Sequence, residues 1–156
     1  MNNRDDMNVK FNVGNYWLSK ATEIHYNIDE YSFSFEPYNN GAALLLINDL
    51  NLSANEENML LGVWGLCPHT QWKPTNSFLD NREKRDLYIG DSRFLDSGVA
   101  TRINQSTWEV FINETKQWVC IGNPDLHGCS IEFAPGAVLV LSEQSEALSM
   151  WLKISG

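Results

Sequence analysis

No lysine or arginine occurs between Lys20 and Lys73. This cation-free stretch contains seven carboxylates, which are Glu23, Asp29, Glu30, Glu36, Asp49, Glu56 and Glu57. The whole chain has a formal net charge of −9 at pH 7. Because a negative field repels phosphate backbones and anionic lipid headgroups, we expect no direct binding of nucleic acid or membrane. The same field attracts cationic partners and speeds their association.

Long hydrophobic runs are also missing. The longest, Ala42 to Ile47, has the length of one strand, whereas a membrane-spanning helix needs about 18 apolar residues. No apolar stretch follows the charged residues 1–6, as it would in a secretory signal. We therefore expect a cytoplasmic protein.

Cysteine is scarce, and its number is odd. Cys67, Cys120 and Cys129 cannot all pair within one chain, which favours a reducing compartment. With 156 residues, of which 43% are hydrophobic and six are tryptophan, the chain can bury a core without disulfides or metal. We expect a single domain over residues 1–156.

Hydrophobic and polar residues alternate along most of the chain, which predicts strands with one buried face. These strands are expected over residues 9–13, 24–28, 31–35, 42–52, 99–104, 107–113, 117–122, 129–133, 137–141 and 147–154. In one of them, Trp108, Val110 and Ile112 should share a face, with Phe111 on the other. About ten strands at this spacing predict a mostly β fold, either an antiparallel sandwich or a strongly bent barrel-like sheet, with at most one or two short helices.

Four segments are harder to assign. Residues 53–56 read as a capping box for a single helical turn, or as a polar hairpin loop before a strand over 59–66. Two prolines within residues 67–76 predict a loop or an edge strand. The charged run 80–86 is expected to be an exposed loop. Residues 142–154 favour a strand at their end, although their composition also suits a helix.

Two Cys/His pairs are the most specific chemical feature. Cys67 and His69, like His127 and Cys129, are two residues apart, so on a strand each pair would point the same way and offer zinc ligands. Structural zinc sites more often use Cys-x-x-Cys spacing, so core thiols and surface imidazoles are the favoured interpretation, and no cofactor is expected. No nucleotide-binding or hydrolase motif occurs, and no enzyme activity is expected.

Without catalytic motifs, the acidic stretch favours binding of a basic protein. A cationic toxin such as a nuclease needs a positive active site, so an acidic inhibitor of the bacterial immunity-protein type would match its charge. The candidate partner-binding residues are Asp29, Glu30, Glu36, Glu56 and Glu57, with Tyr38 and Trp72 as aromatic anchors. This hypothesis requires the carboxylates to share one surface.

Two other functions are consistent with the sequence. A small-molecule or carbohydrate-binding β domain would line a concave face with aromatic rings and carboxylates, so an aromatic cleft would favour it. A hydrolase would place His69 or His127 beside a carboxylate or thiol in a deep pocket. No motif identifies a family, and the oligomeric state is left open.

Overall fold

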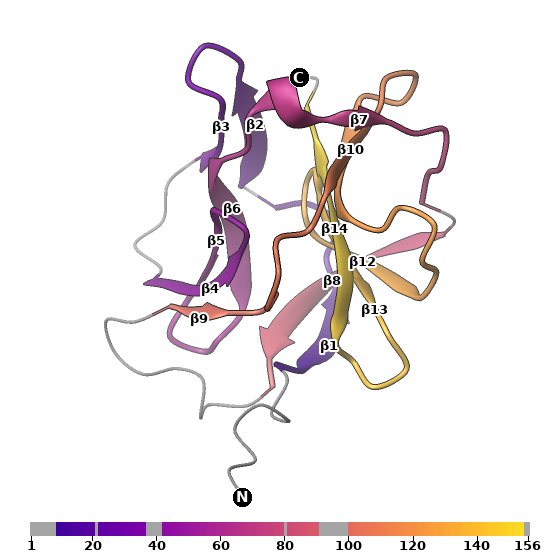
Figure 1. Cartoon of the computed structure of the whole chain (residues 1–156). Coiled ribbons are helices and arrows are strands. Elements are labelled where there is room, and N and C mark those ends of the chain that lie inside the picture. The colour runs from indigo at the N-terminus through magenta and orange to yellow at the C-terminus, as the bar shows by residue number, and fades with distance from the viewer. Residues whose placement is uncertain (1–8, 21, 37–41, 80, 91–99, 155–156) are drawn as a thin grey trace, which may run out of the picture.

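Two mixed β-sheets pack against each other in the structure, a computed structural model of the chain (Figure 1). The structure describes residues 9–20, 22–36, 42–79, 81–90 and 100–154, without the side chains of 42–44. The predicted β sandwich is confirmed, since the strands divide into two sheets instead of forming one bent sheet.

The two sheets differ in size and in the order of their strands. In spatial order, the eight-stranded sheet contains β1 (Phe11–Tyr16), β8 (Arg82–Ile89), β12 (Cys129–Ala134), β13 (Ala137–Leu141), β14 (Ala147–Lys153), β11 (Trp118–Gly122), β10 (Val110–Asn113) and β7 (Lys73–Pro74). The six-stranded sheet contains β2 (Glu23–Asn27), β3 (Ser32–Glu36), β6 (Leu60–Leu66), β5 (Leu50–Ala54), β4 (Ala42–Ile47) and β9 (Thr101–Arg102). Most neighbours are antiparallel; β8–β12, β7–β10 and β4–β9 are parallel.

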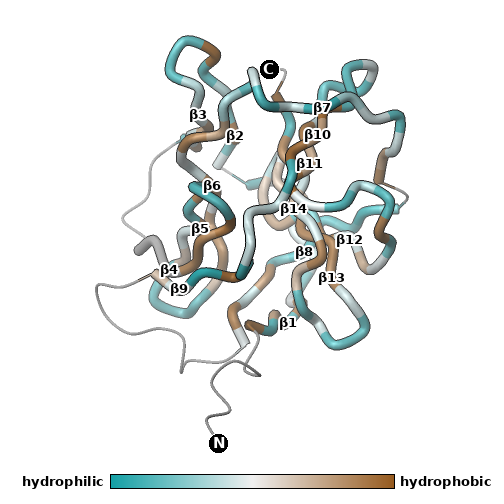
Figure 2. Tube along the Cα trace, viewed as in Figure 1, coloured by the Kyte–Doolittle hydropathy of each residue, from teal (hydrophilic) through white to brown (hydrophobic). Residues whose placement is uncertain are grey.

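The central strands of the eight-stranded sheet are buried on both faces. On β14, Met150 and Leu152 point into the core between the sheets, whereas Trp151 points to a second cluster on the outer face. Brown, hydrophobic residues accordingly follow these strands in Figure 2. The outer cluster is covered by Phe78, whose ring centroid is 5.8 Å from that of Trp151 and 6.0 Å from that of Trp118. Because successive side chains on these strands point to opposite faces, the sheet has a hydrophobic core on each face.

Strand β10 shows the predicted separation of faces. Trp108, Val110 and Ile112 pack against the core between the sheets, and Phe111 packs against the outer cluster. The expected strand over 147–154 is also confirmed, as β14, and the helical alternative is wrong. The segment forms a strand because it pairs with β11 on one side and β13 on the other, where both of its faces become buried.

The prediction of one strand over residues 42–52 is wrong. Strands β4 and β5 form a hairpin here, and the turn between them contains Asn48 and Asp49. Asn48 has a φ of 53°, in the left-handed region that asparagine tolerates better than most residues. The continuous apolar pattern concealed this turn, because both strands of the hairpin are buried.

The charged run was predicted to be a loop, and most of it is strand β8. Its backbone pairs with β1 on one side and with β12 on the other. Distant parts of the chain supply opposite charges: Arg82 Nε lies 2.6 Å from Oε1 of Glu132 on β12, and Asp86 Oδ1 lies 2.8 Å from Nζ of Lys20, in the segment between β1 and β2. Partners distant in sequence therefore make a strand possible where local composition favours a loop.

The structure also decides between the two interpretations of residues 53–56. They end β5 and begin a turn, in which Asn55 Oδ1 accepts the N–H groups of Glu57 and Met59. The hairpin loop before a strand is confirmed, and the helical turn is wrong. Residues 67–76 contain a short 3-10 turn, η2 (His69–Gln71), followed by the edge strand β7.

The close approach of β6 to Phe35 gives a first testable prediction. A Cβ at Gly62 would overlap the Phe35 ring, which is fully buried. Gly62→Ala should lower the free energy of unfolding by about 1–3 kcal/mol, measured by urea denaturation. Ser34→Ala, at an exposed position of β3, is the control and should leave the midpoint nearly unchanged. Equal midpoints for the two variants would contradict this account of the packing.

Candidate functional site

The predicted partner-binding carboxylates lie in three places. Asp29 and Glu30 are in the β2–β3 turn, and Glu56 and Glu57 are in the β5–β6 turn. Strand β6 separates these turns and, with seven residues at about 3.3 Å each, keeps them roughly 20 Å apart. Glu36 ends β3, where it pairs directly with Glu23. All five are exposed, but they do not share one surface.

These carboxylates are not neutralised by basic residues within the described part of the chain. The ion pairs there are Lys20–Asp86, Lys73–Glu109, Arg82–Glu132 and Arg85–Glu83. Strand β8 supplies two of these four cations, and their partners are on β8 itself or on the adjacent β12. The negative charge of the two turns is therefore available to a partner.

The β2–β3 turn carries exposed apolar side chains beside its carboxylates. Tyr31 is 43% exposed, and Ile28 and Leu66 are also exposed. Asn27, Ser32 and Leu66 are aligned across β2, β3 and β6, which places these side chains at one end of the sheet. We call Ile28, Asp29, Glu30, Tyr31 and Leu66 the hairpin tip.

Tyr31 has an unusual backbone conformation. Its φ is 55°, which is rare for a bulky residue and costs free energy. The carbonyl of Tyr31 accepts the Cys67 N–H at 2.7 Å, and its ring stacks on His69 with centroids 5.2 Å apart. These contacts hold the ring in a defined position on the surface.

A hydrogen-bonded aromatic cluster, made of Tyr26, His69 and Trp72, packs beside the tip. The Tyr26 hydroxyl donates to the Cys67 carbonyl at 2.9 Å and accepts the His69 N–H at 3.2 Å. Burial raises the pKa of Tyr26, so the hydroxyl keeps its proton. In the turn itself, Asn27 Oδ1 accepts the N–H groups of Asp29 and Glu30 at 3.0 and 3.2 Å. The tip is thus held by hydrogen bonds to Cys67 and within its own turn, and by the stacking of Tyr31 on His69 of η2.

Trp72 was predicted to be the exposed anchor, and it is half-buried. Its ring lies 5.0 Å from that of Tyr26 and 6.1 Å from that of His69. Its indole nitrogen is buried. Trp72 therefore supports the tip, and the exposed aromatic residue of the tip is Tyr31, which sequence alternation grouped with buried Phe33. Tyr38 lies outside the described residues.

The Cys/His pairs do not form a metal centre within the described residues, where no three His, Cys, Asp or Glu side chains are suitably grouped. Cys67 directly follows β6 of the six-stranded sheet, whereas Cys129 begins β12 in the other sheet. His69 lies among aromatic rings, and His127 is exposed in the loop before β12. Burial raises the pKa of Cys67 to about 11, so its thiol is protonated at neutral pH and is a poor nucleophile.

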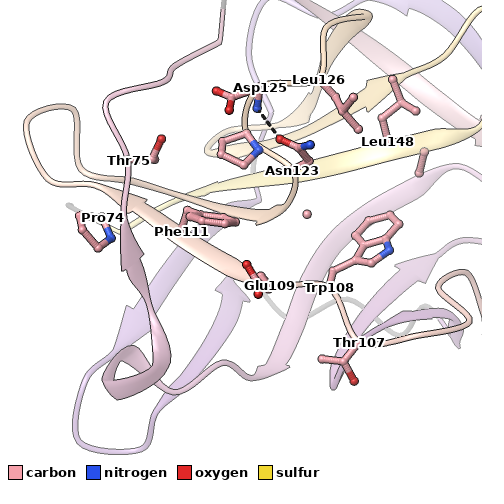
Figure 3. A pocket seen from close by; sticks show the side chains of 13 residues that line it. Pro74, Thr75, Thr107, Trp108, Glu109, Phe111, Asn123, Asp125, Leu126 and Leu148 are labelled. Carbon is pink, nitrogen blue, oxygen red and sulfur yellow. Dashed lines mark hydrogen bonds between the residues drawn. The ribbon is translucent and has the colours of Figure 1, made fainter.

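A separate groove of about 740 Å³ lies beside the start of β10 (Figure 3). Its lining includes two aromatic rings, two carboxylates, an amide and an aliphatic side chain, which belong to Trp108, Phe111, Glu109, Asp125, Asn123 and Leu148. None of these residues was predicted to belong to a site. The alternation placed Trp108 and Phe111 on opposite faces of the strand, so it gave no signal for a shared groove, and Asp125 comes from the loop after β11.

No protein-family model matches the chain, and no curated protein matches it. No helix in the described residues has the length and hydrophobicity needed to cross a membrane. A functional proposal therefore depends on the geometry of the hairpin tip and of the groove.

The thiols give a second testable prediction. Cys129 is exposed, whereas Cys67 and Cys120 are buried. At pH 8, Ellman's reagent should modify one thiol quickly in the native protein and three after denaturation. Cys129→Ser should abolish the fast phase. A fast phase that survives this substitution would contradict the burial of the other two thiols.

The pH dependence of stability gives a third prediction. Burial raises the pKa of Cys67 to about 11 and of Cys120 to about 12, above the ordinary 9.0. Their contribution is therefore complete below pH 9 and is lost as the pH rises through these raised values. The free energy of unfolding should fall between pH 9 and 11, and Cys120→Ala should reduce that fall. A fall of equal size in the variant would refute the assignment to Cys120.

Proposed function

We propose that this protein is an acidic, cytoplasmic binding domain that inhibits a basic protein, in the manner of bacterial immunity proteins. The hairpin tip is the contact surface. The observation that carries the proposal is the position of Tyr31, which is exposed, held in a strained conformation and adjacent to two uncompensated carboxylates. Rigid aromatic residues are typical of the energetic centres of protein interfaces.

Charge supports a basic partner. Asp29 and Glu30 belong to the cation-free stretch between Lys20 and Lys73. Lys73, the first cation after it, lies 3.0 Å from Glu109 and is compensated there. A nuclease toxin presents cations to its phosphate substrate, so carboxylates at the tip would steer it into contact and occupy the same cations.

The size of an ordinary interface favours one turn over both. A partner typically buries about 800 Å² on each side, which is a small part of the total surface of 8840 Å². Because β6 holds Glu56 and Glu57 at the other end of the sheet, they lie outside a contact centred on Tyr31. The five predicted carboxylates do not meet the requirement of one shared surface, so the proposal keeps only the adjacent pair Asp29 and Glu30 as binding residues.

The cysteines agree with a cytoplasmic location. Cys129 is an exposed free thiol, and both other cysteines are free and buried. Free surface thiols are more common in reducing compartments than in secreted proteins. Inhibition by binding also requires no cofactor and no catalytic residue of this chain.

A fourth prediction compares two charge reversals of equal size. Asp29→Lys with Glu30→Lys should abolish capture of a basic protein from the source cell, because the steering carboxylates are lost. Glu56→Lys with Glu57→Lys makes the same charge change at the distant turn and should retain capture. With the captured protein purified, wild-type association should slow as salt rises, and the complex should be inactive when the partner's activity is assayed.

Two results would refute this proposal. The first is capture of the same protein by both double variants, and the second is a captured partner whose net charge is negative. Far-UV circular dichroism and thermal unfolding of each variant separate a lost contact from a lost fold.

A fifth prediction tests the aromatic centre of the tip. Tyr31→Ala should weaken the complex at least tenfold, mainly through faster dissociation, as is usual for a central aromatic residue. Val13→Ala is a matched control, because Val13 is 44% exposed and Tyr31 is 43% exposed. Equal affinities for the two variants would remove Tyr31 from the interface.

A further inference from the structure

We propose that the groove beside β10 is a second binding site and that its ligand is a neutral oligosaccharide. The site lies on the eight-stranded sheet and shares no residue with the hairpin tip. It therefore stands independently of the protein-binding function, and each can be tested without the other.

The size and lining of the groove suit a small ligand. Its volume of about 740 Å³ falls in the usual range of roughly 300–1,000 Å³ for ligand sites. Trp108 and Phe111 are both half-buried, so part of each ring is open to a ligand. Figure 3 shows Glu109 between these rings, with Asn123 and Asp125 across the groove. An extended ligand would thus meet rings on one side and polar groups on the other.

Trp108 is held in place by a buried amide network. The backbone N–H of Trp108 donates to Asn48 Oδ1 at 2.9 Å, and its backbone carbonyl accepts from Asn48 Nδ2 at 2.9 Å. Asn104, which is buried, donates from Nδ2 to the same Asn48 oxygen at 2.6 Å. Asn48 belongs to the β4–β5 turn of the six-stranded sheet. These bonds fix the backbone of Trp108, and its side chain packs against the core between the sheets, so less freedom is lost when a ligand binds.

Both carboxylates of the groove are also positioned in advance. Glu109 Oε1 accepts from Lys73 Nζ at 3.0 Å, and the Glu109 carbonyl accepts the Gly122 N–H at 2.9 Å. Asp125 Oδ1 accepts the Ser77 hydroxyl, while the Asp125 N–H donates to Asn123 Oδ1 at 2.9 Å. Each carboxylate thus has one oxygen held by a neighbouring side chain, so its orientation in the groove is set before a ligand binds.

These features select for hydroxyl groups on a partly apolar ring. The C–H face of a sugar can stack on an indole, while its hydroxyls donate to fixed carboxylate oxygens. An anionic ligand would be repelled by Glu109 and Asp125. A cationic ligand would be attracted mainly by Asp125, because the charge of Glu109 is already compensated by Lys73. A purely apolar ligand would bury carboxylate oxygens without partners.

The test begins with an array of neutral oligosaccharides built from glucose, mannose, galactose, xylose and N-acetylglucosamine, with sulfated and sialylated glycans alongside. We expect binding to at least one neutral series and none to the anionic glycans. The dissociation constant of the best neutral ligand is then measured by isothermal titration calorimetry. Trp108→Ala should raise it at least tenfold, and Trp108→Phe and Asp125→Asn should each raise it by a smaller factor.

Tyr16→Ala is the matched control, because Tyr16 is a 62% exposed aromatic residue on β1, at the opposite edge of the eight-stranded sheet from β10 and β7, and should leave sugar affinity unchanged. Should Trp108→Ala fail to fold by circular dichroism, the two milder variants decide the result. The proposal is overturned if no neutral glycan binds at about 10 mM, if anionic glycans bind better, or if sugar affinity is the same in Trp108→Phe, Asp125→Asn and the wild type.

Discussion

Alternation of side chains on the central strands is the constraint on which the rest of the structure depends. On β11, Val119 and Ile121 enter the core between the sheets, while Trp118 and Cys120 enter the outer cluster. Because both faces of these strands are buried, a shift by one residue would exchange the two cores. The register is therefore strongly specified. It also positions both proposed surfaces, since the groove adjoins β10 and β11 and the tip extends from strands that cover the same core.

Asparagine side chains hydrogen-bond to the backbone of the turns and loops at both surfaces. Asn27 accepts backbone N–H groups in the β2–β3 turn, Asn123 does so in the loop after β11, and Asn48 brackets the backbone of Trp108. Such bonds replace the hydrogen bonds that a turn loses when it leaves the sheet. In each case the fixed backbone presents an exposed or half-exposed side chain. The tip and the groove are thus ordered by polar contacts around a rigid apolar core.

The strands that could be predicted from sequence are those whose environment is reflected in their own residues. Strands β11 and β13 carry apolar side chains on both faces, so their pattern alone identified them, whereas the composition around β14 also allowed a helix. The turn at Asn48 was missed because both of its flanking strands are apolar. Strand β8 was missed because Arg82 and Asp86 are compensated by Glu132 and Lys20, which lie far away in sequence. Local composition does not reveal such partners.

The sequence by itself determined the β class, the two faces of β10 and the absence of cations over a third of the chain. These properties depend on neighbouring residues, and they can be seen in a local window. Only the tertiary structure decided that the two acidic turns lie at opposite ends of β6 and that Trp108, Phe111 and Asp125 meet around one groove. Strand order and long-range pairing set those positions, and they arise from the packing of the whole chain rather than from any local pattern.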